Sequence, residues 1–191
     1  MDMAQTIALS AGLAWASGLR LYLVVFLAGV LAHFGYLHLP DTLSMLQNPL
    51  VIGVAGIMAC AELIADKVPA FDSLWDTVQT FIRIPAGALL AAFALGDVDP
   101  AWMVAAGLIG GTITAGTHFA KAGSRLAINT SPEPFSNWLA SFGEDGMVLA
   151  GLWTMLASPM VFLGLLAIFL IFAGFLLVKL WGFMGRLFRR V

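Results

Sequence analysis

Long apolar runs are the feature of this sequence that most limits its fold. About twenty consecutive apolar residues are needed to cross a bilayer. Only 10% of the 191 residues are charged, and the mean hydropathy is +0.96. The sequence therefore predicts an all-α fold, a single polytopic membrane domain over residues 1–191, with about six transmembrane helices at roughly 5–33, 49–65, 78–96, 101–121, 137–157 and 160–182.

The positions of lysine and arginine predict the orientation, because short cytoplasmic loops of membrane proteins retain these cations. We expect a multi-pass protein of the inner (plasma) membrane with both termini cytoplasmic. The N-terminal stretch MDMAQTIALS lacks the cationic region of a signal peptide and is expected to begin the first helix. With six spans, eight of the nine cations then fall at or near the cytoplasmic side: Lys67, Arg83, Lys121, Arg125, Lys179, Arg186, Arg189 and Arg190.

Three spans followed by three would place the halves 1–97 and 98–185 in opposite orientations, as in the inverted repeats of small transporters. The stretches SAGLAWASGLR and AAGLIGGTITAGTH share an AGL and a later step between small residues. Glycine-rich apolar helices share such features by chance as well, so both architectures stay open. Small residues at helical spacing predict close helix packing in preference to a pore, and they are Gly107, Gly110, Gly111 and Gly116.

Composition and motifs argue against several classes of function. A net charge of −2 provides no basic surface for nucleic acid. The single cysteine, Cys60, lies in an apolar run, where it favours neither a disulfide nor a metal cluster. The sequence has no HExxH, no GxSxG and no glycine-rich phosphate loop. We therefore expect no enzymatic activity and no cofactor, and the sequence identifies no metal ligands.

Ionisable residues within the apolar runs are the candidate functional residues, because an arginine in the middle of a span costs about 2.5–3.5 kcal/mol on insertion scales. Arg20 lies deep in the first run and needs a partner, water or a helix break at ASGLR. Glu144 and Asp145 are adjacent in the fifth run, and one of them is expected to approach Arg20 or Arg83. The alternative is that the fifth helix starts only after Asp145, which would leave both acids in a loop.

Residues 61–76, AELIADKVPAFDSLWD, hold four acids between two apolar runs. Glu62 and Asp66 are four residues apart and share a helix face, as do Asp72 and Asp76. The proline between the two pairs predicts a turn, followed by a helix start at which Asp72 can act as a cap. Glu62 and Asp66 have no such local role, so we expect them to face a cation, a proton or an arginine.

The remaining candidates lie at similar depth. Arg83 shares a helix face with Asp76, and His118, whose side chain titrates near neutral pH, is a candidate proton relay, with a packing role as the alternative. Together these residues predict a polar cavity that opens to the cytoplasm and is closed on the outer side by apolar packing. The expected substrate-binding or ion-binding residues are Glu62, Asp66, Asp76, Arg83, Glu144, Asp145, Arg20 and His118.

Two stretches, AELIADKVPAFDSLWDTVQTFIRIPAGALLA and SPEPFSNWLASFGEDGMVLAG, resemble an uncharacterised family of small bacterial integral membrane proteins, known as a domain of unknown function. The resemblance covers about residues 5–175 and implies membership without an activity, substrate or cofactor. The positions that it marks are Glu62, Asp66, Lys67, Pro69, Asp72, Trp75, Asp76, Arg83, Pro85, Gly87, Pro132, Pro134, Ser136, Asn137, Trp138, Glu144 and Asp145.

Three functions remain open on the sequence. The favoured one is a transporter or channel for a small ion or polar solute, with Arg20 or Arg83 as an internal counter-charge to the acids. The second is a structural or accessory subunit of a membrane assembly. Expected partners are membrane lipids and a small ion or polar solute, and the apolar last run suggests a lipid-facing helix or a homo-oligomer interface. The third function is a lipid-phosphate translocase, whose headgroup would meet Lys67, Arg83, Lys121 and Arg125.

Overall fold

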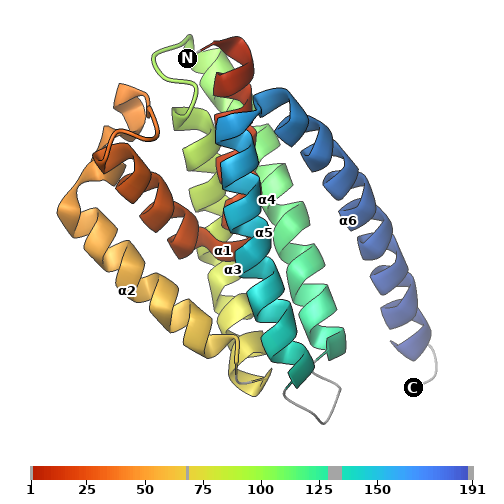
Figure 1. The fold of residues 1–191 in the computed structure, drawn as a ribbon. Helices are drawn as coiled ribbons and strands as arrows, with labels where there is room; N and C mark the ends of the chain where they lie inside the picture. Colours follow the sequence, from red (N-terminus) through yellow and green to blue (C-terminus); the bar gives the residue numbers. More distant parts are fainter. Residues whose placement is uncertain (1, 68, 129–134, 189–191) are drawn as a thin grey trace.

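The computed structural model describes residues 2–67, 69–128 and 135–188, and over these residues it is all-helical. The helices form one bundle, with the last helix leaning away from the others at its C-terminal end (Figure 1). Each of the six apolar runs falls mainly in one α-helix. The elements are α1 (Met3–His33), the 3₁₀ helix η1 (Asp41–Gln47), α2 (Pro49–Ala65), α3 (Pro69–Phe93), α4 (Pro100–Ile128), α5 (Phe135–Ala157) and α6 (Pro159–Phe188).

Short local signals set the helix boundaries. The side chains of Asn48 and Asp99 cap α2 and α4 by accepting hydrogen bonds from backbone N–H groups two residues later, at 2.9 and 2.8 Å. Gly35 and Gly96, with φ of +78° and +77°, follow the ends of α1 and α3, where a left-handed conformation stops a helix. Proline, whose fixed φ suits the first helical position, begins four helices, at Pro49, Pro69, Pro100 and Pro159.

The start of α3 corrects one expectation. The helix begins at Pro69, so Asp72 lies inside the first turn and is not the residue that caps the helix. The prediction was wrong because proline suits the first helical position so well that the helix starts three residues before Asp72. A carboxylate in the first turn is still favourable near the positive end of the helix dipole.

Helix α1 changes direction sharply at Arg20, which has non-helical backbone angles (φ −146°, ψ 74°). Its first part runs from one end of the bundle to the centre, and its second part returns toward the same end (Figure 1). The side chain of Gln5 accordingly lines the same small pocket as Tyr36 and His38. A straight helix of 31 residues would be about 46 Å long. The two ends of α1 meet only because the helix doubles back.

This break changes the expected topology. Helices α2 to α6 run between the two ends of the bundle in alternate directions (Figure 1). The end of α6 lies beside the end of α4, where Leu180 and Gly123 line one groove. The start of α1 therefore lies at the opposite end of the bundle from the end of α6. The structure does not confirm the expectation that both termini are cytoplasmic, because the first run does not cross as one straight helix.

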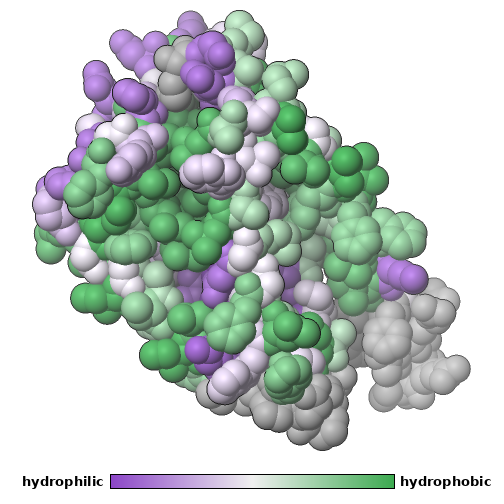
Figure 2. All heavy atoms as spheres, in the orientation of Figure 1, coloured by the Kyte–Doolittle hydropathy of each residue, from purple (hydrophilic) through white to green (hydrophobic). Residues whose placement is uncertain are grey.

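Within the described residues, three helices are long and apolar enough to cross a membrane: α1, α4 and α6 over Pro159–Gly182. A fourth is added if η1 and α2, which meet at 66°, form one bent span. Figure 2 shows a mainly hydrophobic surface over the helices, with hydrophilic residues gathered at the end where the chain starts. These features indicate a membrane protein. They do not confirm six spans, and because α1 is broken whereas α4 is continuous, they do not confirm an inverted repeat.

Close packing of the glycines on α4 is confirmed for three of the four positions. A side chain added at Gly110 would collide with Ala91 of α3, and one at Gly111 would come within 3.2 Å of Ala88. The same atom at Gly107 would lie 3.6 Å from the Ala88 carbonyl oxygen. At Gly116 no atom lies within 4 Å, so this glycine does not serve packing within the chain.

This difference predicts the outcome of two matched substitutions. Gly110→Leu should destabilise the protein by at least about 1–3 kcal/mol, the usual cost of overpacking a tight contact, because α3 and α4 would be pushed apart. Gly116→Leu, the same change on the same helix, should have little effect. Thermal unfolding in detergent, followed by fluorescence-detected size-exclusion chromatography, measures both. Equal losses of stability would contradict the packing assigned to Gly110.

Candidate functional site

Nine ionisable side chains from five helices and their ends join into one network, which we call the charge cluster. Ten ion pairs within 4.0 Å connect them, and eight of the nine residues are buried. The exception is Asp145, whose side chain is 23% exposed. The cluster consists of Arg20, Glu62, Asp66, Asp76, Arg83, Lys121, Arg125, Glu144 and Asp145.

The break in α1 places Arg20 inside this cluster. Its Nη1 lies 2.6 Å from Asp66 Oδ2, and its Nε lies 2.9 Å from Asp145 Oδ1. Nη2 donates to the hydroxyl and the carbonyl oxygen of Ser141 at 2.8 and 3.2 Å, and Glu144 lies 3.8 Å away. The expectation that Glu144 or Asp145 approaches Arg20 is confirmed. Arg20 is buried within the protein, where its guanidinium is held by α5 and the end of α2.

All three guanidinium nitrogens of Arg125, on α4, donate hydrogen bonds within the protein. Its Nε and Nη2 donate to the two oxygens of Glu144 at 2.8 and 3.0 Å, a bidentate geometry. Nη1 donates to the side-chain and backbone oxygens of Asn137 at 2.6 and 3.0 Å, and Nη2 also lies 3.4 Å from Asp66. Asn137 in turn donates to the Asp66 carbonyl oxygen at 3.0 Å, which ties the start of α5 to the end of α2.

Lys121 lies one turn earlier than Arg125 on α4 and contacts the backbone at the break in α1. Its Nζ donates to the backbone carbonyl oxygen of Leu19 at 3.1 Å. This carbonyl belongs to the turn of α1 that ends at the break, where carbonyl groups lose their helical partners. The same Nζ lies 3.3 Å from Glu144, 3.5 Å from Asp66 and 3.7 Å from Asp76. Lys121 thus supplies charge to three acids and caps the first part of α1.

Arg83 of α3 forms a second centre in the cluster. It pairs with Glu62 and, at 3.1 Å, with Asp76. The pair with Asp76 agrees with the prediction that Arg83 and Asp76 share a helix face. Its Nη1 also lies 3.4 Å from His118 Nδ1. Arginine can only donate, so Nδ1 accepts, and the ring proton sits on Nε2, which lies 2.7 Å from Thr80 Oγ1. His118 is therefore neutral here, and it packs beside the cluster without joining an ion pair.

Among the residues that the structure describes, the cluster contains one more acid than base. Its five carboxylates face four cations, a difference of one negative charge. The acids also differ in their number of cationic partners. Counting the described residues, Asp66 and Glu144 each have three and Asp76 has two, whereas Glu62 has only Arg83 and Asp145 has only Arg20.

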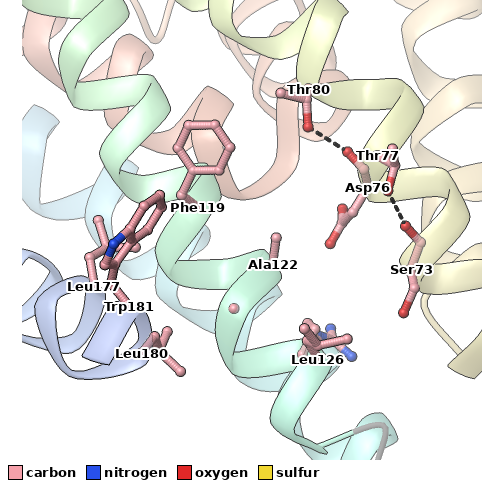
Figure 3. Close-up of a pocket in the computed structure, with 12 residues that line it drawn as sticks. Ser73, Asp76, Thr77, Thr80, Phe119, Ala122, Leu126, Leu177, Leu180 and Trp181 are labelled. Carbon is pink, nitrogen blue, oxygen red and sulfur yellow. Dashed lines mark hydrogen bonds between the residues drawn. The ribbon is translucent and has the colours of Figure 1, made fainter. Parts of the chain in front are cut away.

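Two grooves reach the cluster from different sides. The α3–α4–α6 groove, of about 630 Å³, has a polar wall on α3 and an apolar wall that includes Phe119 and Trp181 (Figure 3). In this view the Asp76 carboxylate points toward the groove. The α1–α2–α5 groove, of about 450 Å³, is lined mainly by apolar side chains, with Arg20, Glu62 and Asp145 among its lining residues. Hydrophilic atoms also show through a hollow between hydrophobic side chains in the middle of the face in Figure 2.

The described residues do not confirm the expectation of a polar cavity open to the cytoplasm. Seven of the eight predicted site residues form part of the cluster, and His118 contacts it. Among the described residues they do not enclose a polar chamber, because the acids and bases fill the space by pairing with one another. No group of three or more His, Cys, Asp or Glu in the described part of the chain is placed to hold a metal ion.

Sequence analysis missed part of the site. Lys121 and Arg125 were expected only as headgroup ligands, although their spacing of three and seven residues from His118 places all three on one face of α4. Nothing in the sequence singled out Ser141, and Asn137 was noted as a motif position and a possible helix cap but not as a partner of the charged residues. Of the positions that the resemblance marks, Pro132 and Pro134 lie outside the described residues.

Comparison with known proteins supplies a family and no activity. No curated protein and no solved structure matches the chain. A family model described as a domain of unknown function (DUF4126) matches residues 7–179. This confirms the resemblance expected from the two motif stretches, and the chain belongs to that uncharacterised family.

Proposed function

We propose that this protein is a small membrane transporter that moves a cation by way of the charge cluster. The cation is either a proton or an ion whose movement is coupled to that of a proton. The observation that carries the proposal is the break of α1 at Arg20, inside the cluster. Broken helices in transporters direct the polar ends of their half-helices at a binding site near the middle of the membrane. Buried ionisable residues within spans are in general functional candidates.

The charge balance favours a cation over an anion. The surplus carboxylate of the cluster attracts one positive charge, and in a site of low polarity that attraction is strong. An anionic substrate such as a lipid phosphate would need free donors. Arg20 and Arg125, the cations that line the two grooves, already direct their guanidinium groups at Asp66, Glu144, Asp145, Ser141 and Asn137.

Transport can be tested directly in reconstituted vesicles. With a pH-sensitive dye inside and a proton gradient imposed, the wild-type protein should collapse the gradient, and Asp145→Asn should lose most of this flux. Asp145 is chosen because it is the most exposed acid of the cluster and has a single cationic partner. Asp97→Asn, at an exposed acid outside the cluster, is the matched control and should behave as wild type.

The alternative function is a structural subunit, and one observation favours it: eight of the nine cluster residues are buried, and all nine form ion pairs with one another. Vesicles with wild-type protein that pass neither protons nor Na⁺ nor K⁺ under gradients of each would support this alternative. So would an Asp145→Asn protein whose flux, per folded molecule, equals that of wild type.

The fold also supports a specific topology, which we propose for the inner (plasma) membrane. Helices α2 to α6 would cross the membrane, and α1 would enter from the outer side and return to it. The cation-rich end of the bundle, with Lys67, Arg125 and Lys179, would face the cytoplasm, as short cytoplasmic loops require. This topology keeps the charge asymmetry of the sequence and moves only the N-terminus to the outer side.

Cysteine labelling tests this topology. In a Cys60→Ser background, Met3→Cys and Asp97→Cys should react with an impermeant maleimide added outside intact cells. Phe135→Cys should react only after the cells are opened. Met3, Asp97 and Phe135 are all exposed in the structure, so reactivity will report their side of the membrane. Labelling of Met3→Cys and Phe135→Cys from the same side would contradict the re-entrant course of α1.

A further inference from the structure

We propose that the α1–α2–α5 groove binds an apolar monovalent cation, such as a quaternary ammonium or phosphonium compound, with its charge beside Glu62 and Asp145. This inference rests on the proposed function in that it names the class of substrate, but the binding site itself can be tested without transport. The groove takes its walls from three helices, which contribute Leu23 and Phe26 from α1, Gly56 and Leu63 from α2, and Leu149 from α5.

The acids of this groove retain acceptor capacity. Glu62 is buried, and in the part of the chain that the structure describes Arg83 is its only cationic partner and its Oε2 has no hydrogen-bond partner. Asp145 also has one cationic partner, Arg20, and is the most exposed acid of the cluster. The two acids of the cluster with a single cationic partner therefore line the same groove. A buried carboxylate oxygen without a partner is costly, and a bound cation would offset that cost.

The groove offers no comparable site for an anion. Arg20 is its one cation, and this side chain is already surrounded by Asp66, Asp145, Glu144 and the oxygens of Ser141. The surplus of one carboxylate in the cluster matches a single positive charge. The acids therefore set the charge of the ligand, because the guanidinium of Arg20 already lies within 4.0 Å of three carboxylates.

The size and the apolar walls of the groove determine which substituents the cation can carry. A volume of about 450 Å³ is in the range of small-molecule sites. Its walls are mainly apolar and include Phe26, an aromatic ring against which a cation can pack. A hydrated metal ion would find too few ligands here, since no set of three metal-binding side chains is present in the described residues. A cation with apolar substituents satisfies both the acids and the walls.

The α3–α4–α6 groove fits such a ligand less well. Its acid, Asp76, is shared by Arg83 and Lys121. Arg125 also lines that groove, which adds a positive charge. We therefore assign the ligand to the α1–α2–α5 groove alone.

The single cysteine of the chain provides a direct test. Cys60 is exposed and lines this groove, so its reaction with N-ethylmaleimide reports access to the site. Tetraphenylphosphonium should slow labelling of the purified full-length protein in a concentration-dependent way. Tetraphenylborate, which has the same shape and the opposite charge, should not slow it. Equal protection by the two ions, or no protection by tetraphenylphosphonium, would overturn the proposal.

Two matched variants locate the binding site. Gly56→Leu fills the groove, because an added side-chain atom already meets the Phe26 ring at 3.2 Å, whereas Gly53→Leu on the same helix points into open space. Equilibrium dialysis of labelled tetraphenylphosphonium should show loss of binding in Gly56→Leu and wild-type binding in Gly53→Leu. Glu62→Gln should weaken binding about tenfold, or about 1.4 kcal/mol. Equal binding in the two glycine variants would place the ligand elsewhere.

The outcomes separate this inference from the proposed function. Proton flux without tetraphenylphosphonium binding would leave the transporter proposal standing and reject the substrate class. Binding without any flux would support the site and reject the transporter. The comparison between the two tetraphenyl ions uses only wild-type protein, so it stands even if Glu62→Gln fails to fold.

Discussion

Replacing Arg20 with glutamine should destabilise the folded protein by about 3–5 kcal/mol, the usual cost of removing one partner from a buried ion pair. Asp66 and Asp145, at 2.6 and 2.9 Å, would lose their nearest cation, and Asp145 would lose its only one. The cluster would then hold five carboxylates against three cations. Glutamine keeps a hydrogen-bond donor near Ser141, so the loss isolates the charge. Unfolding in mixed detergent, followed by circular dichroism, measures the free-energy difference.

A double-mutant cycle separates pairing from general damage. If Arg20 and Asp145 stabilise each other, Asp145→Asn combined with Arg20→Gln should cost less than the sum of the two single changes, because the stranded carboxylate is removed with its partner. Additive losses would show that the two side chains do not interact in the folded protein, whatever their separation in the structure.

Replacing Lys121 with methionine should have a comparable effect, about 3–5 kcal/mol, and should act on α1 in particular. The change removes a charge shared by Glu144, Asp66 and Asp76, and it leaves the Leu19 carbonyl without its donor. Hydrogen–deuterium exchange should therefore rise at residues 19–24 more than in α6. Measurement by mass spectrometry in detergent resolves peptides of this size.

The control for this prediction is the same substitution at an exposed site. Lys179 lies on α6, is exposed and packs only over the ring of Phe175 in the contacts described. Lys179→Met should change neither the stability nor the exchange of α1 by a measurable amount. A Lys121→Met protein with wild-type exchange at residues 19–24 would show that the lysine does not hold the break.

The helices could be predicted from the sequence because their signals are local. Apolar runs bounded by Asn-Pro, Asp-Pro or Ser-Pro pairs locate the starts of α2, α4 and α6, since these pairs cap a helix and fix its first residue. The path of α1 could not be predicted in this way. A break at ASGLR was one of several ways to accommodate Arg20, and only the contacts with Asp66 and Ser141 show which one the protein uses.

The members of the charge cluster could be anticipated, but not their pairing. A charge inside an apolar run must find a partner, so Arg20, Glu62 and Glu144 stood out without any structure. Which acid meets which base depends on how helices far apart in the sequence pack. Arg83 was as good a candidate for the acids of α5 as Arg20, yet it pairs with Glu62 and Asp76 because the end of α2 lies against α3. Asn137 carries no charge, so although the family resemblance marked it, nothing in the sequence indicated that it would bind Arg125.

The doubled-back course of α1 has a consequence for biosynthesis. Arg20 is translated early, but Ser141, one of its hydrogen-bond partners, follows 121 residues later, and the acids beside it on α5 come later still. The nascent first helix therefore meets the translocon with an arginine that has no partner, at a cost of about 2.5–3.5 kcal/mol. Asp66, at the end of α2, is the first of its partners to be made, and the contacts with Ser141, Glu144 and Asp145 can form only after α5 has been made. The surroundings of Arg20 are therefore completed in two stages, the second of which requires the fifth helix.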